Sequence, residues 1–239
     1  MKTLMLILLA LFSFNAQAAK RALVYNGPGA CDGCYQAANQ IAIRAGLDPT
    51  YVNENGLTET STQAEKEALF KDVVVWLQPG GKSSIVMQNI NDVLKSALQD
   101  YVKAGGGYVG FCAGAFASTE MVGTTSYLGY GFLPGSTKVY KDRYQADVVP
   151  ITWNGKVRNI YWEGGPYIYN LPNDGDSEVI ATYPNGQVAA ARSHFGKGKV
   201  FVSGVHPEAT QDWFDDYGMQ SPSGLNFDLA VDMVNWAIQ

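Results

Sequence analysis

Residues 106–115 read GGYVGFCAGA, and this stretch decides the fold. The apolar run Tyr108 to Phe111 has strand character and leads into Cys112, which stands between two glycines. A G-x-nucleophile-x-G sequence at a strand-to-helix junction is typical of a nucleophile elbow, in which the glycines permit a sharp turn. The helix N-terminus and the N–H of Ala113 would then favour a thiolate and a developing oxyanion. The alternative is that Cys112 is a small buried core residue, the usual state of a free cysteine.

Upstream of the elbow, strand-like and helix-like segments alternate. Apolar runs at 21–25, 50–53 and 73–77 predict strands, and helical patterns occupy 33–45 and 89–103. This alternation predicts a parallel sheet that is covered by helices on both faces.

Downstream, the pattern changes to short alternating runs that are separated by turns such as Asn154-Gly155 and Asn185-Gly186. These runs predict antiparallel strands. They lie at 148–153, 156–161, 178–183, 188–192 and 200–203. A closing helix is expected over 225–238, and no Pro- or Ser-rich linker divides the two halves. We therefore predict one α/β domain over 19–239, a mostly parallel sheet with an antiparallel extension in its second half.

A second chemical motif, His206-Pro207-Glu208, follows the predicted strand at 200–203. In a parallel sheet this position brings the imidazole to the edge that carries Cys112, where it could take the thiol proton. Glu208 could hold the other ring nitrogen. A histidine on a loop is more often incidental, but the chain has only two. The other, His194, precedes the turn-like sequence FGKG and is interpreted as a hairpin residue.

The pair Cys31 and Cys34 forms a CxxC between the first predicted strand and the first predicted helix. A local disulfide is the simplest interpretation for an exported chain. A metal site is disfavoured, because no second CxxC or pair of histidines completes a set of four ligands. Redox activity is the third interpretation, since a thioredoxin-like CxxC also opens a helix after a strand. Against it, Ala30 stands where such proteins place a bulky aromatic residue.

Composition and the N-terminus narrow the class of protein. The 239 residues hold 17 Lys and Arg against 22 Asp and Glu, scattered along the chain, which disfavours a nucleic-acid binder. Lys2, the apolar run 4–12 and the sequence Ala16-Gln17-Ala18 predict a secretory signal peptide over residues 1–18. We expect a periplasmic or secreted protein without membrane contact after cleavage; an N-terminal membrane anchor is the alternative.

Five motifs together resemble the class I glutamine amidotransferase-like superfamily and, within it, the biotin-protein ligase N-terminal-domain-like family. They occur in the family's order along nearly the whole mature chain. The motifs are Tyr25 to Gly29, Gln78 to Gly81, Gly106 to Ala115, Gly164 to Tyr167 and Gly204 to Glu208.

This resemblance implies a flavodoxin-like sheet with Cys112 as nucleophile, His206 as base and Glu208 as its orienting partner. It also implies that the loop at Gly80 and Gly81 lies opposite the elbow, with Gly81 and Ala113 donating the two oxyanion N–H groups. The chain departs from the family in ending soon after this domain, with no ligase or synthetase part to receive ammonia. Biotin ligation is therefore not expected.

Several further residues are candidates for substrate contacts. They are Asn26, Gly80, Glu163 and Tyr167. Glu163 and Tyr167 belong to a loop, 162–167, that serves either as a wall of the cleft or as a rigid packing loop. Trp213, Phe214 and Tyr217 form either a substrate lip or an ordinary capped loop.

Three functions remain open from the sequence. The first is a cysteine-nucleophile hydrolase, of amidase or peptidase type, that acts on a small-molecule or peptide amide without a cofactor or metal. The second is a ligand-binding module of the same fold without turnover, and the third is a CxxC thiol-disulfide oxidoreductase. The substrate and the oligomeric state are not predicted.

Overall fold

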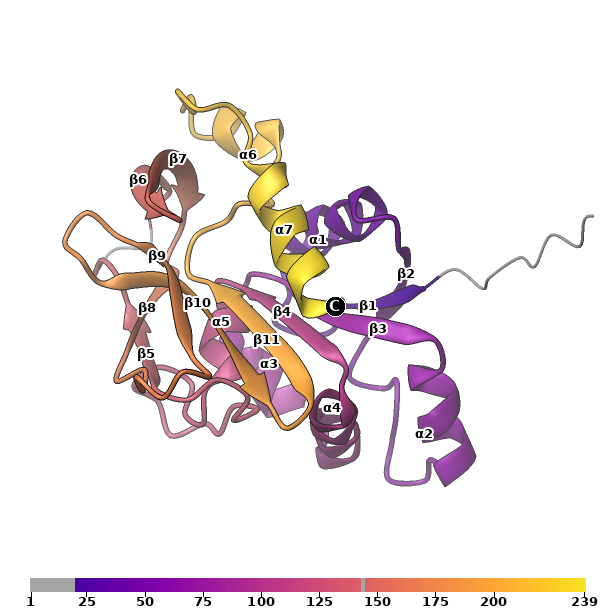
Figure 1. The fold of residues 1–239 in the computed structure, drawn as a ribbon. Helices are drawn as coiled ribbons and strands as arrows, with labels where there is room; N and C mark the ends of the chain where they lie inside the picture. Colours follow the sequence, from indigo (N-terminus) through magenta and orange to yellow (C-terminus); the bar gives the residue numbers. More distant parts are fainter. Residues whose placement is uncertain (1–19, 143–144) are drawn as a thin grey trace, which may run out of the picture.

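The computed structural model describes residues 20–142 and 145–239. The predicted signal peptide, residues 1–18, lies outside the described residues. A twisted sheet runs through the centre of the molecule, with helices packed on both of its faces (Figure 1).

The first part of the sheet is parallel. Its strands lie in the order β2 (Asp48–Val52), β1 (Arg21–Tyr25), β3 (Val73–Gln78), β4 (Gly107–Phe111) and β11 (Gly198–Ser203). This order is the flavodoxin-like arrangement, in which the carboxyl ends of the strands meet at one edge. Strands buried on both faces need continuous apolar sequence, and β3 has it in the run VVVWL.

The second part of the sheet is antiparallel. Beyond β11 follow β10 (Val188–Phe195), β9 (Glu178–Thr182), β6 (Asp147–Trp153) and β7 (Lys156–Trp162). A side branch adds β8 (Pro166–Tyr169), which pairs with β10 and with β5 (Ser136–Val139). The predicted mostly parallel α/β fold with an antiparallel extension is thus confirmed.

Two layers of helices cover the sheet. On one face, α1 (Asp32–Arg44) and α7 (Phe227–Ala237) pack side by side. On the other lie α3 (Ser83–Asn89), α4 (Asp92–Ala104) and α5 (Ala113–Ser118). The apolar stripe of α4 is Leu94, Leu98 and Val102, all fully buried. Helical spacing of these side chains therefore fixes which face of α4 meets the sheet.

Two helices were not predicted from the sequence pattern. α2 (Gln63–Phe70) has no buried residue and so no apolar stripe; a capping box between Thr62 and Glu65 begins it instead. The predicted helix at 89–103 is in fact α4, preceded by the separate short helix α3. The break falls at Asn91, whose side chain caps α4 by accepting a hydrogen bond from the Leu94 N–H at 2.9 Å.

Candidate active site

Cys112 occupies a strained turn between β4 and α5. Its backbone angles are φ 49° and ψ −98°, a conformation that a residue with a side chain rarely adopts. Its N–H donates to the Ser203 carbonyl at 2.8 Å, which ties the turn to the end of β11. A Cβ at Gly114 would lie 2.3 Å from the Gln78 carbonyl oxygen, so only glycine allows α5 to approach β3 this closely. The turn has the form of a nucleophile elbow.

His206 and Glu208 lie beside this elbow, just after β11. The His206 Nδ1 is 2.8 Å from the Glu208 Oε1, and both side chains are buried. The imidazole also interacts electrostatically with Cys112. A backbone hydrogen bond from the His206 N–H to the Tyr161 carbonyl, 2.8 Å long, holds the segment against β7. The fold therefore brings the thiol close to the hydrogen-bonded pair of imidazole and carboxylate.

The charges of this group favour a protonated imidazole. Burial lowers the pKa of His206, but the negative charges of Glu208 and Cys112, together with the hydrogen bond to Glu208, outweigh burial and raise that pKa to about 10. The Glu208 Oε2 is buried, and among the described residues it has no hydrogen-bond partner. Because an unpaired buried charge is costly, the imidazolium is the main stabilising partner of this carboxylate.

The loop after β3 lies next to the imidazole. A Cβ on Gly80 would be 2.7 Å from the His206 Cε1 and 3.0 Å from the Cys34 Sγ, so the glycine lets these two groups share one small space. Gly81 has φ 133°, and a Cβ there would be 2.0 Å from the Gly29 carbonyl oxygen. Among the described residues, the backbone N–H groups of Gly81 and Ala113 have no hydrogen-bond partner. Both are thus available to a ligand.

Cys31 and Cys34 are joined by a disulfide at the start of α1. Cys31 is exposed and is the N-cap residue, and its sulfur accepts a hydrogen bond from the Cys34 N–H at 3.1 Å; Cys34 is buried. Two backbone hydrogen bonds join this segment to the loop after β3. They run from the Lys82 N–H to the Gly29 carbonyl (2.7 Å) and from the Cys31 N–H to the Gly80 carbonyl (3.3 Å). The disulfide is therefore part of the wall behind His206.

Glu163 closes the other side of the site. The Cys112 Sγ lies 3.6 Å from its carbonyl oxygen, and its carboxylate accepts hydrogen bonds from the hydroxyls of Tyr161 (2.9 Å) and Tyr217 (3.1 Å). The Trp213 ring stands 5.2 Å from the His206 ring, centroid to centroid, and 5.4 Å from that of Tyr161. The aromatic segment after His206-Pro207-Glu208 thus reaches the site, as the substrate-lip interpretation requires.

Two of the candidate substrate residues make other contacts in the described part of the chain. Asn26 donates its backbone N–H to the Val52 carbonyl at 2.9 Å, and no contact within the described residues joins its side chain to the triad. Tyr167 lies in β8 opposite Lys138, with its ring 5.7 Å from that of Tyr169. The segment 162–167 was expected to be a loop, but β8 begins at Pro166, so Tyr167 belongs to a strand.

Tyr161 is the contact residue that the sequence did not indicate. Its ring packs against the His206 ring, with the two ring centroids 5.8 Å apart, and its backbone forms an antiparallel β-bridge with that of His206. Within the predicted strand it is one of several alternating apolar positions, so nothing in the local pattern distinguishes it. His194, by contrast, lies exposed in the β10–β11 hairpin opposite Lys199.

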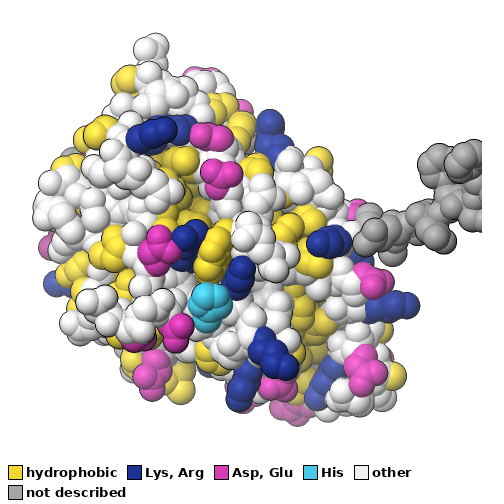
Figure 2. All heavy atoms as spheres, viewed as in Figure 1, with side chains coloured by type: hydrophobic (Ala, Val, Ile, Leu, Met, Phe, Trp, Pro, Cys, Tyr) yellow, Lys and Arg dark blue, Asp and Glu magenta, His cyan; other side chains and the backbone are white. Residues whose placement is uncertain are grey.

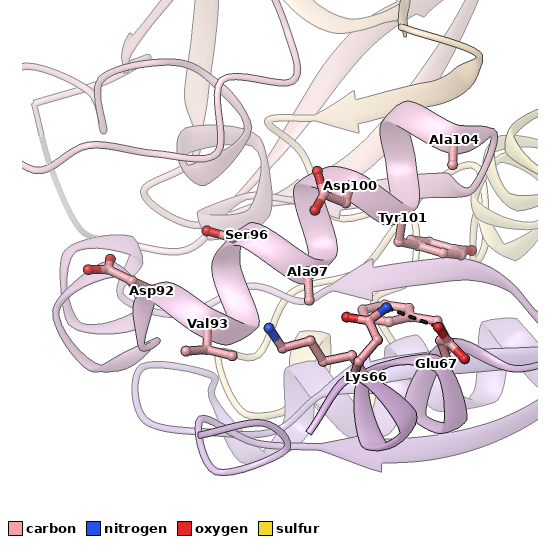
Figure 3. A pocket seen from close by; sticks show the side chains of 11 residues that line it. Lys66, Glu67, Asp92, Val93, Ser96, Ala97, Asp100, Tyr101 and Ala104 are labelled. Carbon is pink, nitrogen blue, oxygen red and sulfur yellow. Dashed lines mark hydrogen bonds between the residues drawn. The ribbon is translucent and has the colours of Figure 1, made fainter. Parts of the chain in front are cut away.

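The next features lie away from the triad. A cavity of about 520 Å³ lies between α2 and α4, and its polar lining mixes Lys66 with Glu67, Asp92 and Asp100 (Figure 3). Acidic and basic side chains are interspersed on the face in Figure 2, without a continuous basic stripe. None of the helices in the described part of the chain is long and apolar enough to cross a membrane.

Parts of this chain are similar in sequence to known proteins. The sequence profile of the family described as biotin-protein ligase, N terminal, matches residues 20–125, a range that includes Cys112 but ends before His206. The biotin–protein ligase of Schizosaccharomyces pombe is 26% identical over 211 residues, which cover 78% of this chain and 33% of the ligase. The chain therefore spans about a third of the length of that relative.

Solved structures share its fold at low sequence identity. PurLQS from Thermotoga maritima matches with a TM-score of 0.63 at 16% identity, covering 92% of this chain and 100% of that one. A putative GMP synthase subunit from Thermoplasma acidophilum matches with a TM-score of 0.58 at 11% identity, covering 92% and 96%. The chain is thus a protein of the class I glutamine amidotransferase-like fold, with a match to the biotin-protein ligase N-terminal family over residues 20–125.

Proposed function

We propose that this protein is an exported thiol-dependent hydrolase, of amidase or peptidase type, with Cys112 as nucleophile. The observation that carries the proposal is the strained elbow at Cys112, which interacts electrostatically with the buried, hydrogen-bonded pair His206 and Glu208. Strain at a residue with a side chain persists only where the surrounding structure imposes it, and it is concentrated at functional sites. A cysteine that only filled the core would need neither the strained turn nor a charged partner.

In the first half of the reaction, the Cys112 sulfur attacks the amide carbonyl carbon. A C–S bond forms and the π electrons of the carbonyl move to its oxygen, which the N–H groups of Gly81 and Ala113 stabilise. When this intermediate collapses, the C–N bond breaks and the proton of His206 passes to the departing amine. The products are a free amine and a thioester on Cys112.

In the second half, the imidazole is neutral and can take a proton from water. The resulting hydroxide attacks the thioester carbonyl, the C–S bond breaks, and the proton on His206 again pairs with the Cys112 thiolate. Glu208 fixes the ring through Nδ1 and stabilises the imidazolium in the resting state.

Export is supported by the signal-peptide pattern at residues 1–18 and by the Cys31–Cys34 disulfide, which persists in oxidising compartments. Biotin ligation is not part of the proposal, because the shared region is about a third of the ligase. A ligand-binding module of the same fold is the competing function, and it would leave Cys112 without enhanced reactivity.

The test begins with alkylation. At pH 6, iodoacetamide should modify Cys112 about tenfold faster or more in the folded protein than in the unfolded chain, because His206 holds the proton that a free thiol would keep. His206→Ala should remove this advantage. A panel of small amides and peptides then identifies turnover, which Cys112→Ser should abolish. Equal alkylation rates in the folded and unfolded chain, with no effect of His206→Ala, would favour the binding module.

A further inference from the structure

Glu163 contacts the nucleophile through its backbone and carries a carboxylate on its side chain. The Glu163 carbonyl oxygen is 3.6 Å from the Cys112 Sγ, and its side chain extends from the same residue to the hydroxyls of Tyr161 and Tyr217. These two hydrogen bonds hold the carboxylate in one position. A group bound to this carboxylate would therefore sit at a defined distance from the scissile bond.

The hydroxyls position the carboxylate but do not neutralise it. Both partners are neutral phenols, and a carboxylate has about four lone-pair sites, of which these two bonds use two. Among the described residues, no Lys or Arg forms an ion pair with Glu163. Nearby Asp216 adds negative charge, since together with Glu163 it raises the pKa of Tyr217. The carboxylate thus keeps acceptor sites and charge for a ligand.

Aromatic rings stand around this charge. Tyr161 and Tyr217 contact the carboxylate directly, and the Trp213 ring is 5.4 Å from the Tyr161 ring. Tyr217 is 52% exposed, so this group of residues opens to solvent. A carboxylate attracts a cation through its charge, and an aromatic ring adds to this attraction where the cation reaches the ring face.

We propose that Glu163, Tyr161, Trp213 and Tyr217 form a binding site for an ammonium group, so that the substrate is an amide that carries a primary or quaternary amine beside the scissile bond. This inference rests on the proposed hydrolase function. It assigns Glu163 as the residue that selects the substrate, and it disfavours amides whose neighbouring group is an anion.

The experiment measures how fast Cys112 reacts with three methanethiosulfonates that differ in charge: the methyl reagent (neutral), the trimethylammonioethyl reagent (cationic) and the sulfonatoethyl reagent (anionic). With the disulfide intact, Cys112 is the free cysteine, so mass spectrometry reports one site. After correction for reactivity with a free thiol, the cationic reagent should react about three- to tenfold faster than the neutral one, and the anionic reagent slower. The preference should shrink as salt is added.

Variants assign the preference to Glu163. Glu163→Gln should remove most of this preference, measured as the ratio of the cationic to the neutral rate within the same variant, and Glu163→Asp should keep it. Glu59→Gln is the matched control, because Glu59 is an exposed glutamate in the β2–α2 connection. Thermal unfolding of each variant confirms that it is folded, and the salt series on the wild type needs no variant. Equal ratios in wild type and Glu163→Gln, or no reaction of Cys112 with the cationic reagent, would overturn the inference.

The labelling result does not depend on turnover. If no amide is hydrolysed but the cationic preference is present and lost in Glu163→Gln, the ammonium site stands and the hydrolase function fails. If amides are hydrolysed, kcat/KM should be higher for a substrate with a free amine than for its acetylated form. Glu163→Gln should narrow that difference mainly by raising KM for the free amine.

Discussion

Glu208 is the residue on which the charge state of the triad depends. It is fully buried, and its Oε1 contacts the His206 Nδ1 at 2.8 Å. It is also a principal charge that raises the pKa of His206 against the opposing effect of burial. Without this carboxylate, the imidazole loses both its fixed orientation and much of the stabilisation of its protonated form.

We therefore expect Glu208→Gln to lower turnover by roughly tenfold to thousandfold, and by less than Cys112→Ser, because a cysteine depends less on its base than a serine does. The glutamine keeps the size and a hydrogen-bonding group, so the fold should persist. Steady-state kinetics on an amide found by screening, with thermal unfolding alongside, gives the answer. Full turnover at unchanged stability would show that Glu208 does not orient His206.

At the scale of elements, the start of α1 and the loop after β3 form a single unit. Backbone hydrogen bonds join them at Gly29 to Lys82 and at Cys31 to Gly80, and the Cys34 sulfur and the imidazole both adjoin Gly80. The disulfide restrains the segment that holds this loop. Its removal should therefore affect the reactivity of Cys112 through the positions of Gly80 and His206.

The double variant Cys31→Ser/Cys34→Ser should stay folded, since a disulfide that closes so short a loop contributes only about 2 kcal/mol in the chain-entropy model. The alkylation rate of Cys112 at pH 6 should nevertheless fall severalfold. Intact mass of the exported protein, before and after reduction, establishes whether the bond forms in the cell. An unchanged alkylation rate would show that the disulfide stabilises only its own segment. Rapid exchange with a protein thiol would support the redox function.

At the scale of the molecule, the His206 proton couples stability to pH. The pKa of His206 is raised to about 10 in the folded protein, against about 6.5 in an unfolded chain. Protonation therefore stabilises the fold fully below about pH 6.5, and this contribution is lost as the pH rises toward 10.

Because the proposed resting state pairs the imidazolium with a Cys112 thiolate, the folded pair holds one proton, as the thiol of the unfolded chain does up to about pH 8.5. We therefore expect the unfolding temperature to fall mainly between about pH 8.5 and 10, by roughly 2–4 °C for each kcal/mol lost. His206→Gln should flatten the curve in this window. Buried tyrosines such as Tyr108 and Tyr183, whose pKa is raised by burial, affect stability only above about pH 10, so the two effects separate. A wild-type curve that is level from pH 8.5 to 10 would contradict the protonated imidazole.

The amino-acid sequence by itself determined the parallel core and the elbow. Apolar runs such as the one in β3 predict buried strands, and the glycines around Cys112 predict a sharp turn. Both effects depend on a few adjacent residues, so they can be predicted from the local sequence. The helix α2 was not predicted, because it has no buried residue and its start is marked by a capping box. The short strand β8, which carries Tyr167, owes its place to pairing partners far away in the chain.

Only the tertiary structure decided which of the candidate site residues lie together. Glu163 was only one of several polar residues in motif loops, and the structure places its carbonyl against Cys112. The contact of Tyr161 with His206 and the placement of Cys34 beside Gly80 join segments distant in sequence. Such contacts follow from how strands pair and how closely glycines let backbones approach, and these are properties of the packed molecule that no local pattern records.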